Sequence, residues 1–229
     1  FAKETGIQPR TNETLIEDVE VLVLAVKPQV LDYLLPTLHP ELAKFTGLII
    51  SIAAGRTLAQ LTNLLGEEEH AVLRTVPNTP ALVHEGLTAL TPNDQVSKEQ
   101  LAFAKALFAT VGEVTELDES LVDAWSAMIS SSPAFTAIYI ESLADAGVMA
   151  GLPRAEAYPW AAQAVKGTAE LYLQQGGLPA KIKDQVCSPM GSSIYGVAKL
   201  EEKAFRGTVM DAVDTTVKRT QAMSEQSST

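Results

Sequence analysis

Two apolar runs, Val21-Leu-Val-Leu-Ala-Val26 and Leu48-Ile-Ile-Ser-Ile52, decide the fold of this 229-residue chain. Both are uncharged and of strand length, which predicts strands buried on both faces of a parallel sheet. A helical stretch from Pro28 to about Lys44 lies between them, and Pro36 predicts a break in it because an internal proline removes a backbone hydrogen bond. Strands that alternate with helices in this way indicate a mostly parallel sheet with helices on its faces.

The same alternation continues to about residue 118. The remaining predicted elements are strands at Ala71–Val76, Gly86–Leu90 and Glu113–Leu117 and helices at Leu58–Leu65 and Lys98–Thr110. Thr57 can cap the first of these helices, since its hydroxyl can accept from the unpaired N–H groups there. We therefore predict an α/β domain over residues 1–118.

The second half changes character, because only helical periodicity follows residue 118. The predicted helices are Leu121–Met128, Ala134–Ala150, Arg154–Gln175, Ala180–Val186, Ser193–Lys203 and Phe205–Met223. Abundant alanine favours helix formation and close packing. We predict an all-α domain over residues 119–229.

Charge and composition exclude several classes of function. Lys and Arg number 17 and Asp and Glu 28, so the net charge is −11. This balance argues against nucleic-acid binding and against binding to an anionic membrane surface, because both need basic patches. The single cysteine, Cys187, excludes an internal disulfide and fits a reducing cytoplasm. No apolar run approaches the roughly 20 residues that span a bilayer, no secretion signal opens the chain, and three histidines with one cysteine give no metal-ligand spacing.

Three candidate sites follow predicted strands directly. They are Ala25–Gln29, Ser51–Gly55 and Pro77–Pro80. In open α/β sheets, ligands bind in the crevice outside the carboxyl ends of the strands, and small residues allow close approach to the backbone. The alternative is that all three are ordinary turns between strands and helices.

A fourth candidate is the loop Cys187-Ser-Pro-Met-Gly-Ser-Ser-Ile194, which runs into a predicted helix. The backbone N–H groups of Gly191, Ser192 and Ser193 would be unpaired there, and with the helix dipole they would form an anion site. The fifth candidate, Ser130–Pro133, interrupts the helical pattern. In both places the alternative is that the serines only cap a helix.

Taken in order, these segments resemble the pyrroline-5-carboxylate reductase family. The matching motifs cover nearly the whole chain: Ala25-Val-Lys-Pro-Gln29, Ser51-Ile-Ala-Ala-Gly55, Arg74-Thr-Val-Pro-Asn-Thr-Pro80, Ser131-Ser-Pro-Ala134, Gly151-Leu-Pro-Arg154, Cys187-Ser-Pro-Met-Gly191 and Leu200-Glu-Glu. Each motif is weak by itself, and the specificity lies in their order.

The resemblance implies an enzyme that reduces the imine of 1-pyrroline-5-carboxylate to L-proline with NADPH or NADH. It also implies a Rossmann domain for dinucleotide binding over residues 1–118 and a helical dimerisation and substrate domain over residues 119–229. The helices would interlock with those of a second subunit, giving a homodimer or an assembly of dimers with the active site at the dimer interface. It implies no nucleic-acid partner and no membrane.

Residue by residue, the resemblance places the cofactor at five places in the chain. The implied cofactor contacts are Asn12, Ala25, Val26, Lys27, Pro28, Ala53, Ala54, Gly55, Asn78, Thr79 and Glu119. Asn12 would meet the adenosine side, and the loop Ala25–Pro28 would lie beside the ribose and nicotinamide. Ala53–Gly55 match the second cofactor loop, Asn78 and Thr79 match the third, and Glu119 matches an acidic position on the cofactor side.

The implied substrate contacts are Ser131, Gly191, Ser192 and Ser193. Backbone amides at residues 191–193 would hold the carboxylate, and Ser193 matches a threonine whose hydroxyl meets the ring nitrogen. Catalysis would come from positioning and electrostatics, with the imine protonated beforehand or through Ser193 and water. No metal is implied.

The chain departs from the family pattern in several places. Met190 stands where the family has glycine, Ser193 replaces threonine, and Ser130 and Ser132 replace glycines. The family's opening strand, G-x-G-x-x-G loop and helix are also absent from the printed sequence, which begins with Phe1 rather than Met. We expect roughly 30 or more preceding residues, about one strand–helix–strand unit, in the parent protein. The alternative is a catalytically inactive, dimeric binding or regulatory relative.

Overall fold

The computed structural model describes residues 2–66 and 68–226, with side chains described for residues 4–66 and 68–222. The first described element is the short helix α1 (Ala2–Thr5), and Gly6 follows it with a φ of +73°. Among the described residues, none of the helices has the length and apolar character needed to cross a membrane.

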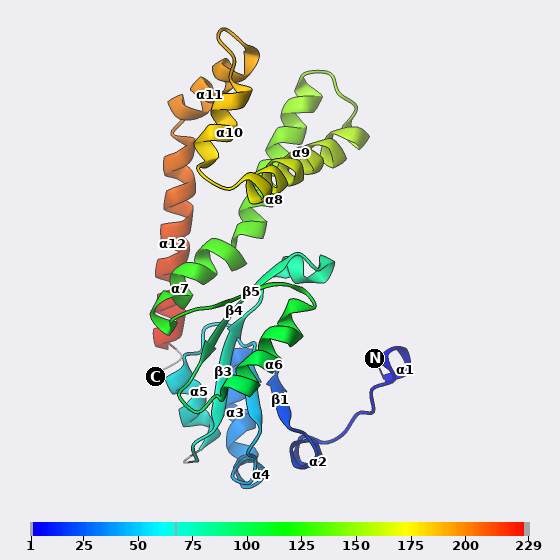
Figure 1. Cartoon of the computed structure of the whole chain (residues 1–229), viewed down its shortest axis with the longest axis vertical. Coiled ribbons are helices and arrows are strands. Elements are labelled where there is room, and N and C mark those ends of the chain that lie inside the picture. Colours follow the sequence, from blue (N-terminus) through cyan, green and yellow to red (C-terminus); the bar gives the residue numbers. More distant parts are fainter. Residues whose placement is uncertain (1, 67, 227–229) are drawn as a thin grey trace. The chain divides into compact units, whose positions relative to one another are not determined.

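A five-stranded sheet forms the centre of the α/β part (Figure 1). Its strands are β1 (Val21–Leu24), β2 (Leu48–Ser51), β3 (Ala71–Val76), β4 (Gly86–Pro92) and β5 (Gly112–Glu116), in that order across the sheet. All neighbours are parallel except β3 and β4. The link from β3 to β4 holds only a short 3₁₀-helix, Thr79–Val83, and is too short for the crossover that parallel strands need. The prediction of a mostly parallel sheet is confirmed.

Helices cover both faces of the sheet. One face packs against α2 (Asn12–Glu17), α3 (Pro28–Thr37), α4 (His39–Leu42) and α5 (Leu58–Leu65), and the other against α6 (Lys98–Ala109). Along β2, Ile49 enters the first core while Leu48 and Ile50 enter the second. This explains why the strand is one continuous apolar run. The predicted helical break is confirmed, since α3 ends at Thr37, one residue after Pro36.

The expectation of burial on both faces is wrong for β1. Val23 is exposed, while Leu22 and Leu24 are buried. The core beneath α6 takes its buried residues from β2, β3, β4 and α6, whereas Val21 of β1 is only partly buried against it. An apolar run therefore predicts that a strand forms more securely than it predicts that both faces of the strand are buried.

The helical half matches its prediction closely. The observed helices are α7 (Val122–Trp125), α8 (Ser132–Met149), α9 (Arg154–Gln175), α10 (Pro179–Val186), α11 (Ser192–Glu202) and α12 (Phe205–Gln226). The predicted helix Leu121–Met128 is shorter than expected: a 3₁₀ turn, Glu119–Leu121, precedes α7 and a π-helical turn, Ser126–Ser130, follows it.

By contacts, the chain divides into two compact units. The first unit contains the residues up to Ser130 together with those from Thr216 onward, and the second contains Ser131–Thr215. The domain boundary at residue 118 stays a prediction. The second unit has a small core of its own, in which Ala144 of α8 packs against Ala157 and Ala161 of α9.

Folding stability should fall on acidification because of His70. The imidazole is buried just before β3, and among the described residues its Nε2 has no hydrogen-bond partner. Burial lowers the pKa of His70 below its ordinary value of 6.5, against a smaller opposing effect from the Phe45 backbone and the Glu68 charge. The unfolded chain thus binds this proton more readily, so stability is lost as the pH falls from about 6.5 toward the folded-state pKa.

Urea unfolding of wild type and of His70→Gln at pH 7.5 and 5.5 measures this effect. The variant should lose less stability on acidification than wild type does. Because His84 is exposed, His84→Gln should retain the wild-type pH dependence. Equal pH dependence in all three proteins would rule out His70 as the source.

Candidate functional site

The first loop, Ala25–Pro28, connects β1 to α3. Pro28 occupies the first turn of α3, where its missing N–H costs nothing, and Lys27 is the N-cap residue without a side-chain capping bond. The start of α3 therefore presents backbone N–H groups and the positive end of the helix dipole without a side-chain acceptor from the cap. Both features favour an anionic or strongly polar ligand.

The second loop, Ala53–Gly55, connects β2 to α5. Ala53 is buried and its N–H donates to Ser51 Oγ at 3.3 Å. Gly55 has a φ of +73°, which favours glycine, and a Cβ added there would meet no atom within 4 Å. Thr57 and Gln60 form the reciprocal cap at the start of α5, as the sequence predicts for Thr57.

The third loop begins with Asn78 and Thr79 after β3. The Asn78 side chain is held at both ends: Oδ1 accepts from the Leu87 N–H at 2.9 Å and Nδ2 donates to the Ile129 carbonyl at 3.5 Å. Thr79 is exposed at the first turn of the following 3₁₀-helix. Asn78 thus fixes this loop against β4.

The sheet brings these three loops to one edge. Leu24, Ser51 and Arg74 are partners in register across the parallel strands β1, β2 and β3. Their carboxyl ends therefore face the same way, as the sequence predicts. Asn12 lies at the exposed first turn of α2, a helix that contacts α4. Its place at the cofactor stays a prediction.

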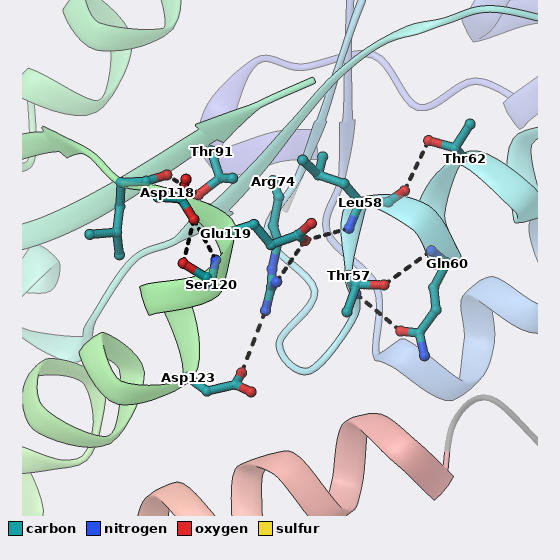
Figure 2. Close-up of polar contacts among 11 residues, drawn as sticks. Thr57, Leu58, Gln60, Thr62, Arg74, Thr91, Asp118, Glu119, Ser120 and Asp123 are labelled. Carbon is teal, nitrogen blue, oxygen red and sulfur yellow. Dashed lines mark hydrogen bonds and ion pairs between the residues drawn. The ribbon is translucent and has the colours of Figure 1, made fainter. Parts of the chain in front are cut away.

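Glu119 connects the second loop to the sheet, as Figure 2 shows. Its Oε1 accepts from the Leu58 N–H at 2.6 Å and from the Arg74 guanidinium at 2.8 Å. Asp123 lies 4.0 Å from the same guanidinium. Arg74 is only 5% exposed, so its charge depends on these two carboxylates.

A separate acidic residue, Asp118, caps the turn that carries Glu119. Hydrogen bonds from the Ser120 hydroxyl and backbone N–H lower the pKa of Asp118 below its ordinary value. The carboxylate therefore remains charged at neutral pH and fixes the start of the turn.

The sequence analysis did not identify Arg56 as a residue that organises the site. It named Arg74 only as the first residue of a family motif. Both are buried arginines. A signal was available for each: Arg74 is the one charged residue in the strand Ala71–Val76, and Arg56 directly follows the Ala-Ala-Gly turn. A charge in a strand that is otherwise apolar indicates a fixed partner.

In the second unit, α11 begins directly after Gly191. Gly191 is the N-cap residue, and no side chain caps the helix. The backbone N–H groups of Ser192 and Ser193 therefore lie in the uncapped first turn, as the sequence predicts for an anion site. The prediction is wrong for Gly191, whose N–H donates to the Ser188 carbonyl at 3.0 Å because the residues before the helix form a turn. Ser131 has the corresponding position before α8, also without a side-chain capping bond.

Met190 is strained by its backbone and not by crowding. Its φ is +59°, in the left-handed region, while its side chain is 89% exposed. For a residue with a Cβ, this backbone conformation is less favourable by roughly 1–2 kcal/mol. The Met190 side chain therefore extends into solvent and does not crowd the loop.

Met190→Gly should therefore raise the free energy of unfolding by about 1 kcal/mol, less the extra entropy that glycine gives the unfolded chain. Denaturant unfolding measures the change. Met190→Ala is the matched control, because it shortens the side chain and keeps the Cβ. An equal gain in both variants would assign the effect to the exposed side chain and not to φ.

Comparison with known proteins gives a consistent result. Residues 119–223 match the family model for pyrroline-5-carboxylate reductase dimerisation. The chain is 48% identical over 204 residues to a pyrroline-5-carboxylate reductase from Synechocystis sp., covering 89% of this chain and 75% of the relative. It is 40% identical over 206 residues to the Escherichia coli enzyme of that name, covering 90% and 76%.

A solved structure agrees with these relatives. The crystal structure of pyrroline carboxylate reductase from Plasmodium falciparum, with NADP bound, matches with a TM-score of 0.86 and 31% identity. The match covers 94% of this chain and 81% of that one.

Proposed function

The chain belongs to the pyrroline-5-carboxylate reductase family, and from this premise we propose how its residues divide the reaction. The activity is reduction of the C=N bond of 1-pyrroline-5-carboxylate to L-proline, with NADPH or NADH as cofactor. The observation that carries the assignment of roles is the convergence of three loops at one edge of the parallel sheet.

The first unit would hold the dinucleotide with Ala25–Pro28, Ala53–Gly55, Asn78 and Thr79. These residues fit the group, because the second loop has a backbone open to approach at Gly55 and the first loop ends at an uncapped helix start. When bound, the reduced nicotinamide supplies the hydride. Asn12 and Glu119 complete the proposed cofactor contacts, and Asn78 keeps the third loop in place through its bonds to Leu87 and Ile129.

The second unit would hold the substrate. The carboxylate suits the N–H groups of Ser192 and Ser193 after Gly191, since a helix N-terminus favours an anion. The hydroxyl of Ser193 would donate toward the ring nitrogen, and Ser131 would line the same site. Their contribution is positioning and electrostatic stabilisation of the imine as its charge changes.

The protein is a homodimer through its helical part. Within the second unit a single chain leaves large apolar side chains open to solvent, among them Trp160, Leu173 and Tyr195, which are 51%, 74% and 69% exposed. A core built around three alanines buries little apolar area by comparison. Burial of such side chains against a second copy supplies the missing stabilisation. A higher assembly of dimers is our proposal, and light scattering tests it.

A steady-state assay tests the proposed function. Purified protein is mixed with NADPH and 1-pyrroline-5-carboxylate, and loss of nicotinamide absorbance is followed together with formation of proline. The expected result is stoichiometric conversion. Failure to produce proline with either NADPH or NADH, in a folded dimer, would contradict the reductase and favour the inactive relative.

We also place the reaction in the cytoplasm. The support is the chain's single cysteine, Cys187, which fits a reducing compartment. Fractionation of cells that express the tagged protein tests this, and recovery in a secreted fraction would contradict it.

A further inference from the structure

A buried arginine joins the first and second loops. Arg56 directly follows Gly55, and its side chain is 4% exposed. One terminal guanidinium nitrogen, Nη2, donates to the Asp32 carboxylate at 2.6 Å and to the Pro28 carbonyl at 3.2 Å. Asp32 and Pro28 both lie on α3, and Pro28 is the last residue of the first loop. The guanidinium thus connects the two loops that the proposed function assigns to the cofactor.

A second set of contacts fixes the start of α5, just after the second loop. Leu58 donates its N–H to Glu119, and Glu119 accepts from Arg74 (Figure 2). Arg74 is the register partner of Ser51, the residue from which the loop departs. The second loop therefore leaves β2 beside Arg74 and reaches α5 next to Arg56, and both arginines are buried.

These anchors matter because, beyond the buried Ala53, the loop continues through the exposed Ala54 and the partly exposed Gly55. Ala53, Ala54 and Gly55 carry small side chains or none, and Gly55 meets no neighbour within 4 Å of a Cβ position. Glycine is also the residue with the greatest backbone freedom. A buried guanidinium resists displacement, since it would have to leave its carboxylate partner in a poorly solvated place. Arg56 suits this role better than lysine would, because its planar group can reach two acceptors at fixed angles.

We propose that Arg56, held by Asp32, is a positioning residue for the dinucleotide. It fixes the separation of the first and second loops, and it acts through Ala53–Gly55 and Pro28 without touching the reacting atoms. This inference rests on the proposed function, because that function assigns both loops to the cofactor. Loss of the link should therefore weaken cofactor binding and leave recognition of the imine substrate unchanged.

Four variants test the proposal: Arg56→Met, Asp32→Asn, the double variant, and Arg56→Lys. Arg56→Met should raise KM for NADPH about tenfold while KM for 1-pyrroline-5-carboxylate stays within about twofold, since a small misplacement of a binding loop has effects of this size. Asp32→Asn should also raise KM for NADPH. The double variant should raise it no further than Arg56→Met does, because both substitutions remove the same Arg56–Asp32 contact. Arg56→Lys keeps the charge and should recover part of the affinity.

Lys105→Met is the matched control. Lys105 pairs with Glu116, and both side chains are about half exposed. A half-exposed pair contributes little, so this variant should leave both KM values unchanged. Thermal unfolding of every variant shows that the comparison is made between folded proteins. Should Arg56→Met fail to fold, Asp32→Asn carries the test, because Asp32 is 41% exposed and its amide retains the shape of the carboxylate.

Unchanged KM for NADPH in Arg56→Met and Asp32→Asn would overturn the inference. So would an equal rise in the KM values of both substrates, because that pattern describes general loss of structure. Fluorescence titration with NADPH in the absence of imine separates this inference from the proposed function. If wild type binds NADPH more tightly than Arg56→Met but forms no proline, the positioning role stands and the reductase assignment fails.

Discussion

Glu119→Ala is expected to lower the free energy of unfolding by about 1.5–3 kcal/mol, because a buried charge loses a hydrogen-bond acceptor that is itself 34% exposed. The charge in question is that of Arg74, which is 5% exposed. Its remaining carboxylate, Asp123, lies at 4.0 Å and can compensate only in part. The Leu58 N–H loses its acceptor at the same time.

Urea unfolding of the purified variant measures the loss. Glu116→Ala is the matched control, because Glu116 pairs with Lys105 at an exposed site and should cost less than about 1 kcal/mol. The double variant Arg74→Met with Glu119→Leu should recover much of the stability, since it removes the charge together with its partner. A cost for Glu119→Ala equal to that of Glu116→Ala would show that Arg74 does not depend on this contact.

Ser193→Ala should lower kcat about 100-fold, the effect typical of a positioned proton donor. The hydroxyl lies in the uncapped first turn of α11, half-buried and without a role in capping the helix. Its removal should leave KM for NADPH unchanged, because we assign the cofactor to loops of the first unit.

Steady-state kinetics with each substrate varied separately make this measurement. Ser193→Thr keeps the hydroxyl and should retain most of the activity, whereas Ser142→Ala removes an exposed hydroxyl that donates to the Ile138 carbonyl within α8 and should change nothing. Turnover of Ser193→Ala equal to wild type would assign protonation of the imine to solvent.

Local pattern was sufficient for most of the fold. The continuous run Leu48–Ile52 predicted β2 because a strand between two helical layers must be apolar on both sides. Arg154–Gln175 was predicted with the bounds that α9 has, since Pro153 precedes it and Gly176 follows it. The same reasoning overestimated the cover on β1, because the strands that build the core beneath α6 are brought together by residues distant in the sequence.

The candidate site also has a part that local sequence predicts and a part that it does not. The three loops could be predicted, because their residues follow strands directly and parallel strands bring their carboxyl ends together. The roles of Ser131, Gly191, Ser192 and Ser193 rest on family resemblance and remain to be tested. The direction of β4 relative to β3 could be inferred only once the short connection between them was known to be a 3₁₀ turn.

The sequence by itself determined the order of strands and helices, the acidic character of the chain and the positions of the three loops that follow β1, β2 and β3. These properties depend on residues within a few positions of one another, where propensity and periodicity act. Only the tertiary structure decided that Arg56 pairs with Asp32, 24 residues away, and that Arg74 pairs with Glu119, 45 residues away. A buried charge needs a partner, and the partner is chosen by how the chain folds back on itself, which no local pattern records.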